Sequence, residues 1–177
     1  MNNTLLPHDP KWKDHFGQER QKLETILQDA KAKLHHIGST AIPGIHAKPI
    51  IDILGEVTCL TAVEAAQSEL LSIGYESLGE YGIAGRRYFR KQSASGRRSH
   101  HLHIFESGSP HVMRHLAFRD YLRAHPAIAA EYSALKVGII AAGDVTWDSY
   151  LDAKAPFIAQ TEADAVIWYK THSRQPR

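Results

Sequence analysis

The chain has 177 residues, of which 43% are hydrophobic and 23% charged, and its formal net charge at neutral pH is +2. This length predicts one domain, residues 1–177, with a proper core. A charge of +2 is too small to indicate nucleic acid as a partner, and no run of eighteen apolar residues or secretion signal is present, so no membrane association is expected. The single cysteine, Cys59, cannot form an internal disulfide, so we expect a cytoplasmic protein.

The first half of the chain alternates between helical and strand-like patterns. The spacing of apolar residues predicts a helix over 10–33, strands over 34–38 and 50–57, and a second helix over 61–73. Thr61 as N-cap, Glu64 at the capping-box position and Gly74 after the last turn define that second helix. Two more strands are expected over 86–91 and 100–105, joined by a hairpin turn over 92–99.

From His111 onward the pattern is helical. One helix is expected to end near residue 124, the next to cover 126–142, and a third to cover 147–169 with a kink or break at Pro156. An Arg119–Asp120 pair is expected to attach this helical tail to the sheet. Strands come first and helices later, so we predict an α+β fold, or an α/β variant of it, with a mixed sheet backed by helices and extended by a C-terminal helical tail.

A lone carboxylate interrupts the apolar strand at residues 50–57. Burying Asp52 without a partner is costly, so its side chain is expected to meet a cation or to face solvent or a ligand. The strand follows Gly38-Ser39-Thr40 and a loop that contains two prolines and a glycine. Small residues, then a loop, then an acid on a strand form a pattern that suits a phosphate and its metal ion. Gly38, Ser39 and Thr40 are therefore candidate substrate contacts.

Two histidines can share the face of the sheet on which Asp52 lies. Side chains alternate across a strand, so Asp52 falls opposite the apolar residues of its own strand, and His101 and His103 fall opposite Leu102 and Ile104. If the two strands are neighbours, the three polar side chains converge. One carboxylate with two imidazoles suits zinc, manganese or iron better than magnesium alone. The histidines could also be ordinary hydrogen-bonding residues of the sheet.

The interval between Glu80 and Glu106 contains six lysines and arginines and no acid. It should attract a compact polyanion such as a triphosphate, and Arg87 and Arg90 are candidate contacts. A solvated hairpin whose arginines point at water is the alternative. Lys48, in the loop before the Asp52 strand, and Lys136, on a later helix, are further candidates for phosphate contact, and both could instead be exposed lysines. Lys154 could close the same basic site from the helical side.

Several motifs together resemble the GrpB-like (UPF0157-type) family over nearly the whole chain. They are Asp9-Pro10-Lys11-Trp12, the stretch from His36 to Leu54, Arg87-Tyr88-Phe89-Arg90-Lys91, His101-Leu102-His103 and Phe118-Arg119-Asp120-Tyr121-Leu122-Arg123-Ala124-His125-Pro126. The resemblance implies a nucleotidyltransferase-like fold. In that fold a Gly-Ser turn contacts a triphosphate, and two strand carboxylates two positions apart bind magnesium.

The chain matches only part of that pattern. Gly38 and Ser39 match the turn, and Asp52 matches one acid, which the resemblance makes the catalytic residue and a metal ligand. His101 and His103, the further metal ligands that we expect, stand on the later strand where that fold would place an acid. Ile50 and Leu54 stand where the paired acid belongs, and Glu56 could replace it only further along the strand. The expected cofactor is Mg²⁺ or Mn²⁺, with Zn²⁺ as a further candidate.

Three functions fit these observations. The first is a nucleotidyltransferase that moves a nucleoside monophosphate from a triphosphate to a small acceptor, with a small-molecule nucleotide as partner. The second is a non-catalytic module for a nucleotide or a coenzyme A-type phosphate, which related domains joined to dephospho-coenzyme A kinases make concrete. The third, a metal-dependent hydrolase built on the Asp and His residues, fits least well. The missing second acid favours the binding module, whereas the Gly-Ser turn and Asp52 favour metal–phosphate contact.

Overall fold

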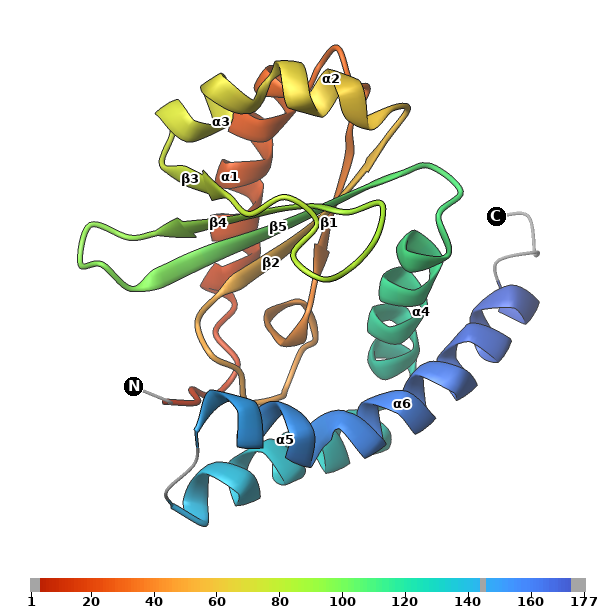
Figure 1. Ribbon diagram of the computed structural model, residues 1–177. Coiled ribbons are helices and arrows are strands. Elements are labelled where there is room, and N and C mark those ends of the chain that lie inside the picture. The colour runs from red at the N-terminus through yellow and green to blue at the C-terminus, as the bar shows by residue number, and fades with distance from the viewer. Residues whose placement is uncertain (1–3, 144–145, 173–177) are drawn as a thin grey trace.

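The computed structural model describes residues 4–143 and 146–172, and its centre is a five-stranded mixed sheet (Figure 1). The strand order is β1-β2-β5-β4-β3, in which β2 and β5 run parallel and every other neighbouring pair is antiparallel. The strands are β1 (Lys33–Ile37), β2 (Ile51–Val57), β3 (Tyr75–Ser77), β4 (Arg87–Gln92) and β5 (Arg98–Glu106).

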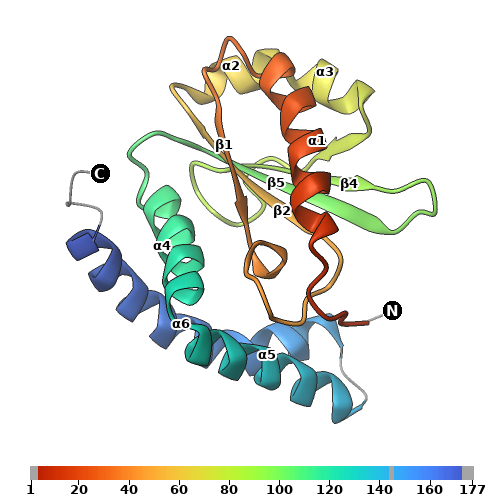
Figure 2. The same ribbon diagram turned by 180° about the vertical axis from the view of Figure 1, so that it is seen from behind.

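Helices lie on both sides of this sheet. α1 (Lys11–Ile26), α2 (Leu60–Ala65) and α3 (Gln67–Ser72) cover one face. α4 (Pro110–Ala124), α5 (Pro126–Ala141) and α6 (Trp147–His172) form a helical tail on the other side, where α4 stands against the sheet and α5 and α6 run past its end (Figures 1 and 2). A short 3-10 helix, η1 (Ser39–Ala41), follows β1. The predicted α+β architecture with a helical extension is confirmed.

Alternation along β2 and β5 divides their side chains between two apolar clusters. Ile51 and Ile53 of β2 and Leu102 and Ile104 of β5 belong to the main core under α1, α2 and α3. Leu54 and Phe105 point the other way and pack with Val112 and Leu116 of α4. The two faces assigned from the sequence are therefore correct.

The first helix is shorter than predicted. It ends at Ile26, and the residues after it form turns, with Lys31 at a φ of +50°. Leu27 and Ala30 are nevertheless fully buried in the main core. The apolar stripe thus continues past the end of the helix, and periodicity alone could not separate the helix from the buried turn.

The helix predicted over 61–73 is two short helices, α2 and α3, which meet at Ala66. The N-cap residue is Cys59, not Thr61, and Glu64 pairs with Arg87 of β4 instead of completing a capping box. Gly74 follows α3 with a φ of +94°, as its expected role after the last turn requires.

The C-terminal elements match their predictions closely. α6 continues through Pro156 without a break, and its course bends in Figure 1. The turn of the β4–β5 hairpin lies at residues 93–97, and the register shifts between Lys91 and Gln92, beside that turn. None of the described helices combines the length and apolar character needed to cross a membrane.

Ile53 tests the main core, because its side chain is completely buried at the centre of the sheet. We expect Ile53→Ala to lower the free energy of unfolding by about 2–5 kcal/mol, since the shortened side chain leaves a cavity. Ile167→Ala on α6 is the matched control, because Ile167 is 66% exposed, and it should change stability by less than about 0.5 kcal/mol. Urea denaturation measures both, and equal losses would contradict this description of the core.

Candidate functional site

Three polar side chains converge where β2 and β5 run side by side. In the parallel register Asp52 pairs with His101 and Leu54 pairs with His103. Asp52, His101 and His103 form what we call the Asp52 cluster, in which one donor atom from each residue lies within 4.8 Å of the others. Nδ1 of His101 lies 3.0 Å from Oδ1 of Asp52 and donates a hydrogen bond to it. The adjacency of the two strands, which the prediction required, is confirmed.

Gly38 brings the backbone after β1 against the Asp52 carboxylate. Its φ is +71°, a conformation that L side chains rarely adopt. A Cβ atom at this position would lie 2.3 Å from Oδ2 of Asp52. Only glycine therefore fits here, and the Gly-Ser turn and the carboxylate face the same small volume.

Charge in the Asp52 cluster is set by burial and hydrogen bonding together. Burial opposes ionisation of Asp52, but the hydrogen bond from His101 and the nearby positive charges hold the pKa of this carboxyl below its usual value. Burial lowers the pKa of His103 to about 3, against the attraction of Asp52. Nη1 of Arg86 lies 3.4 Å from Nδ1 of His103, and because arginine can only donate, the neutral imidazole carries its proton on Nε2.

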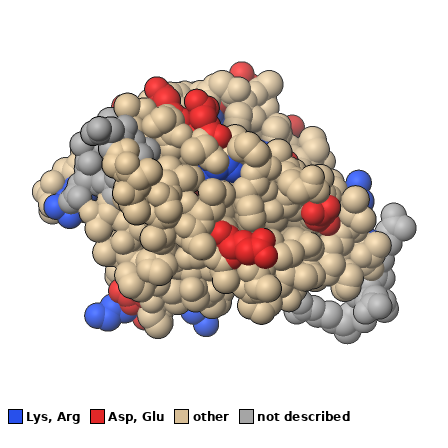
Figure 3. Space-filling view, turned by 90° about the horizontal axis from the view of Figure 1, so that it is seen from below, with Lys and Arg blue, Asp and Glu red and all other residues tan. Residues whose placement is uncertain are grey.

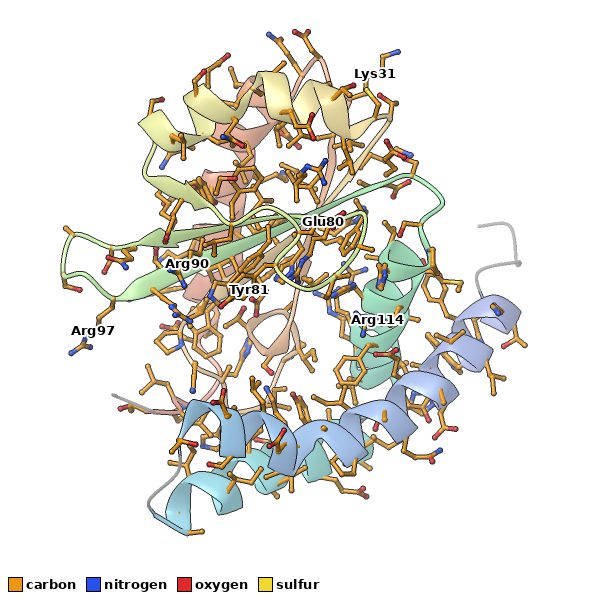
Figure 4. The ribbon with its side chains drawn as sticks, in the orientation of Figure 1. Lys31, Glu80, Tyr81, Arg90, Arg97 and Arg114 are labelled. Carbon is orange, nitrogen blue, oxygen red and sulfur yellow. The ribbon has the colours of Figure 1, made fainter. Side chains whose placement is uncertain are left out.

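A cavity of about 240 Å³ opens beside the Asp52 cluster. Arg114 and His115 of α4 and Glu162 of α6 line it together with Gly38 and Asp52. Arg114 reaches from α4 toward the sheet (Figure 4) and pairs with Glu162 at 2.9 Å. The sequence did not predict that Arg114, His115 and Glu162 line this site. The spacing of His111 and His115, one helical turn apart, was the one pattern that could have pointed to His115.

Lys136 connects α5 to the Gly-Ser turn. Its Nζ donates hydrogen bonds to Oγ of Ser39, at 3.0 Å, and to the carbonyl oxygen of His46, and it lies 4.4 Å from the centre of the Tyr132 ring. The side chain is almost completely buried, and burial with the charge of Lys154 lowers its pKa to about 7. Among the described residues, it forms no ion pair with a carboxylate.

Two further lysines, Lys48 and Lys154, lie close enough to Lys136 or to each other for their charges to interact. The ammonium groups of Lys48 and Lys154 lie 4.6 Å and 4.7 Å from the centre of the Tyr150 ring. Burial and the charges of Lys154 and Arg98 lower the pKa of Lys48 to about 8. Burial also lowers the pKa of Lys154, while Asp52 acts in the opposite direction. We call Lys48, Lys136 and Lys154 the lysine cluster.

The basic interval of the sequence does not converge on Asp52 as a whole. Arg87 pairs across β4–β5 with Ile104, which places it on the α1 side of the sheet, and it binds Glu64. Arg90 is on the same face as His101 but binds Glu76, with 2.6 Å between Nε and Oε2. Arg97 points away from the molecule at the hairpin turn (Figure 4). Acids from other elements thus neutralise much of this interval.

Thr40 and Glu56 lie outside the Asp52 cluster. The buried hydroxyl of Thr40 lies 2.9 Å from Nε2 of His36 and donates to the carbonyl oxygen of Ile50. Glu56 lies 3.8 Å from Nε2 of His35, further along β2. In the part of the chain that the structure describes, Asp52 is the only carboxylate of the cluster.

Comparison with known proteins identifies the family. The sequence matches the GrpB protein family over residues 2–164. The chain belongs to the GrpB family. The UPF0157 protein YqkA of Bacillus subtilis is 42% identical over 94% of this GrpB chain and 48% of YqkA, so the chain spans about half the length of that relative. The dephospho-CoA kinase of Mycobacterium leprae is 30% identical over 93% of the chain and 46% of the kinase.

Solved structures establish the fold of this GrpB chain. The crystal structure of GrpB from Enterococcus faecalis superimposes with a TM-score of 0.87 and 41% identity, over 94% of this chain and 99% of that one. The RNA terminal uridylyl transferase Cid1 gives a TM-score of 0.51 and 18% identity, over 75% of this chain and 42% of Cid1. The likeness to Cid1 concerns the fold alone, which is nucleotidyltransferase-like.

Gly38 and Gly44 provide a matched pair of substitutions. Both have positive φ angles, but a Cβ at Gly44 would meet nothing within 4 Å. Each change to alanine should cost about 1 kcal/mol of stability through the backbone conformation. Gly38→Ala should cost at least about 1 kcal/mol more and shift the His101 ring signals in NMR spectra, because Asp52 must move. If the two variants behave alike, the close approach of Gly38 to Asp52 is wrong.

The lowered pKa of Lys136 should appear in the pH dependence of stability. Between pH 7 and about pH 10 the unfolded chain binds a proton that the folded protein does not, so the free energy of unfolding should rise with pH in that window. Lys136→Met lacks this contribution. The stability of the wild type relative to Lys136→Met should therefore increase from pH 7 to 9.5, by at most about 1.4 kcal/mol per pH unit.

Urea denaturation of both proteins across this range measures the difference, and other titrating groups cancel. Lys170→Met on the exposed surface of α6 is the control, and its difference from the wild type should stay constant. A constant difference for Lys136→Met as well would contradict a lowered pKa.

Proposed function

We propose that this protein binds a nucleoside triphosphate together with a divalent cation, in the space between the Gly-Ser turn, the Asp52 cluster and the lysine cluster. The observation that carries this proposal is the position of Lys136. Its buried ammonium forms no ion pair with any described carboxylate and donates directly to Ser39, the residue that a phosphate would approach. Burying a positive charge without a counter-ion is costly, so a phosphate bound beside the Lys136 ammonium would offset that cost.

The lysine cluster suits the phosphate chain better than the arginines do. Arg87 and Arg90 already bind Glu64 and Glu76. Lys136 instead donates to Ser39, and the ammonium of Lys154 lies over the Tyr150 ring. The face that Figure 3 shows is mostly tan, with red patches of acidic residues, one of them near its centre, and blue atoms mainly near its edges and in one hollow. On this face, attraction for a polyanion would therefore come from recessed lysines and not from an exposed basic patch.

The donor set of the Asp52 cluster fits a divalent cation. One carboxylate and two imidazoles within 4.8 Å of one another match the ligands of zinc or manganese. Asp52 and His101 would hold the ion, and His103 would join them once Nδ1 no longer accepts from Arg86. Such an ion supplies positive charge to phosphate oxygens. Gly38 and Ser39 would supply backbone and hydroxyl donors to the same phosphates.

Turnover is a separate question from binding. Transfer of a nucleoside monophosphate to an acceptor hydroxyl needs a group that takes up its proton, and here the second acid is missing. Nε2 of His101 is buried and has no hydrogen-bond partner, and Asp52 orients the ring through Nδ1. When Nε2 holds the ion, it cannot also take up the proton. We therefore expect nucleotide binding with slow or absent release of pyrophosphate.

A non-catalytic module for coenzyme A-type phosphates is the second candidate. It is favoured by the single carboxylate of the Asp52 cluster and by the similarity of this chain to about half of a dephospho-CoA kinase. In both candidates the lysine cluster binds the phosphate groups of the ligand. The candidates differ in the rest of the ligand, which is a nucleoside in the first and a coenzyme A-type molecule in the second.

Calorimetry with Mn²⁺, ATP and dephospho-coenzyme A tests the proposal. Asp52→Asn should weaken Mn²⁺ binding at least tenfold, about 1.4 kcal/mol. Glu56→Gln is the matched control on the same strand and face, and it should leave Mn²⁺ binding unchanged because Glu56 lies beside His35. Lys136→Met should weaken ATP at least tenfold and leave Mn²⁺ alone unaffected.

The outcomes separate the candidates. Tight dephospho-coenzyme A binding without ATP binding would replace the first candidate with the second. Fast pyrophosphate release that Asp52→Asn abolishes would show that the protein is an efficient transferase and overturn the expectation of slow turnover. If neither ligand binds the wild type, both candidates are wrong.

A further inference from the structure

A second cavity, of about 430 Å³, lies at the free edge of the sheet. Figure 2 shows β1 at this edge, between α1 and α4. The cavity, which we call the β1-edge pocket, is lined by residues of the chain before α1, of α1 itself, of β1, of the η1 segment and of α4. Thr40 and Ala41 line it, whereas Gly38 lines the cavity beside Asp52. The β1-edge pocket thus adjoins the other end of the same turn.

Basic and imidazole side chains dominate the polar part of this pocket. Lys13, Arg119 and Arg123 line it together with His8, His35 and His36. None of the lining residues that the structure describes is acidic. A volume of this size accommodates a small organic molecule. The charge of the lining favours an anion.

The two arginines differ in how much of their hydrogen-bonding capacity is used. Arg119 donates to both oxygens of Asp120 and to the carbonyl oxygen of His36, so it mainly holds α4 against β1. Arg123 donates through Nε to the carbonyl oxygen of Ala41, and its Nη1 lies 3.8 Å from Oδ1 of Asp120. The side chain of Arg123 is 40% exposed. Its outer N–H groups are therefore available as a fork for an oxyanion.

Imidazole rings and an apolar wall make up the rest of the lining. Nδ1 of His8 is buried and forms no hydrogen bond, whereas Nε2 of His35 lies 3.8 Å from Oε2 of Glu56 of β2. Because both nitrogens are covered by the protein, Arg123 and Lys13 supply the donors for an anion. The rings of His36 and Phe16 stack with centres 4.9 Å apart and an angle of 10°. Leu34 and Pro43 complete an apolar wall.

From this arrangement we infer that the β1-edge pocket binds a small molecule with a phosphate or carboxylate group, held by Arg123 and Lys13. Its apolar part lies against the wall of Phe16, Leu34 and Pro43. This site is separate from the nucleotide site proposed above and does not depend on it. A ligand bound here contacts the η1 turn from the side opposite Asp52.

NMR titration with inorganic phosphate and, separately, with acetate at constant ionic strength tests this inference. In the wild type at least one probe should cause saturable shifts in the ring signals of His35 and His36 and in the Nε signal of Arg123. Arg123→Gln should raise the dissociation constant at least tenfold, because glutamine cannot provide the fork. The probe that binds more tightly distinguishes phosphate from carboxylate as the recognised group.

Two further variants keep the test decisive. Lys13→Gln changes an exposed lysine on α1, so it should fold normally and weaken binding about threefold even if Arg123→Gln is unstable. Lys136→Met removes the cation of the proposed nucleotide site and should leave these shifts within twofold of the wild type. The inference is overturned if neither probe gives saturable shifts at these residues, if folded Arg123→Gln and Lys13→Gln bind like the wild type, or if Lys136→Met abolishes the response.

Discussion

The buried ammonium of Lys136 joins α5 of the helical tail to the loop that precedes the Asp52 strand. It binds Ser39 and the carbonyl oxygen of His46, and Ser133 on the same helix binds the backbone N–H of His46 at 2.9 Å. These bonds hold α5 against the loop between β1 and β2. Desolvation of the charge opposes them, and the lowered pKa of Lys136 reflects that cost. The described residues thus surround this cation with two neutral oxygens and the face of the Tyr132 ring.

The sheet face of the site could be predicted because strand geometry is local and periodic. Asp52, His101 and His103 were assigned to one face from alternation within their own strands, and the parallel pairing of β2 and β5 brings them together. The boundaries of α1, and the division into α2 and α3, could not be predicted in the same way. Leu27 and Ala30 are buried whether or not they are helical, so the apolar pattern carries no information about where the helix ends.

The helical side of the site depends on contacts between distant parts of the chain. Lys136 and Ser39 are 97 residues apart, and their contact follows from how α5 docks, which no pattern within α5 indicates. The charge of the basic interval also depends on contacts between distant parts of the chain. The segment between Glu80 and Glu106 contains no acid, which suggested an exposed positive surface, but Glu64, Glu76 and Glu19 reach it from α2, β3 and α1. Charge balance is a property of the folded surface and cannot be read from one segment.

The register shift between Lys91 and Gln92 has a consequence for how this fold tolerates change. An added residue within a strand ordinarily turns every later side chain to the opposite face. Here the irregularity sits between the hairpin turn and the regular ladder in which Arg90 pairs with His101. A change in length at residues 93–97 can therefore be absorbed before it reaches His101. This turn is a place where a reporter group or a short peptide could be inserted while the Asp52 cluster keeps its geometry.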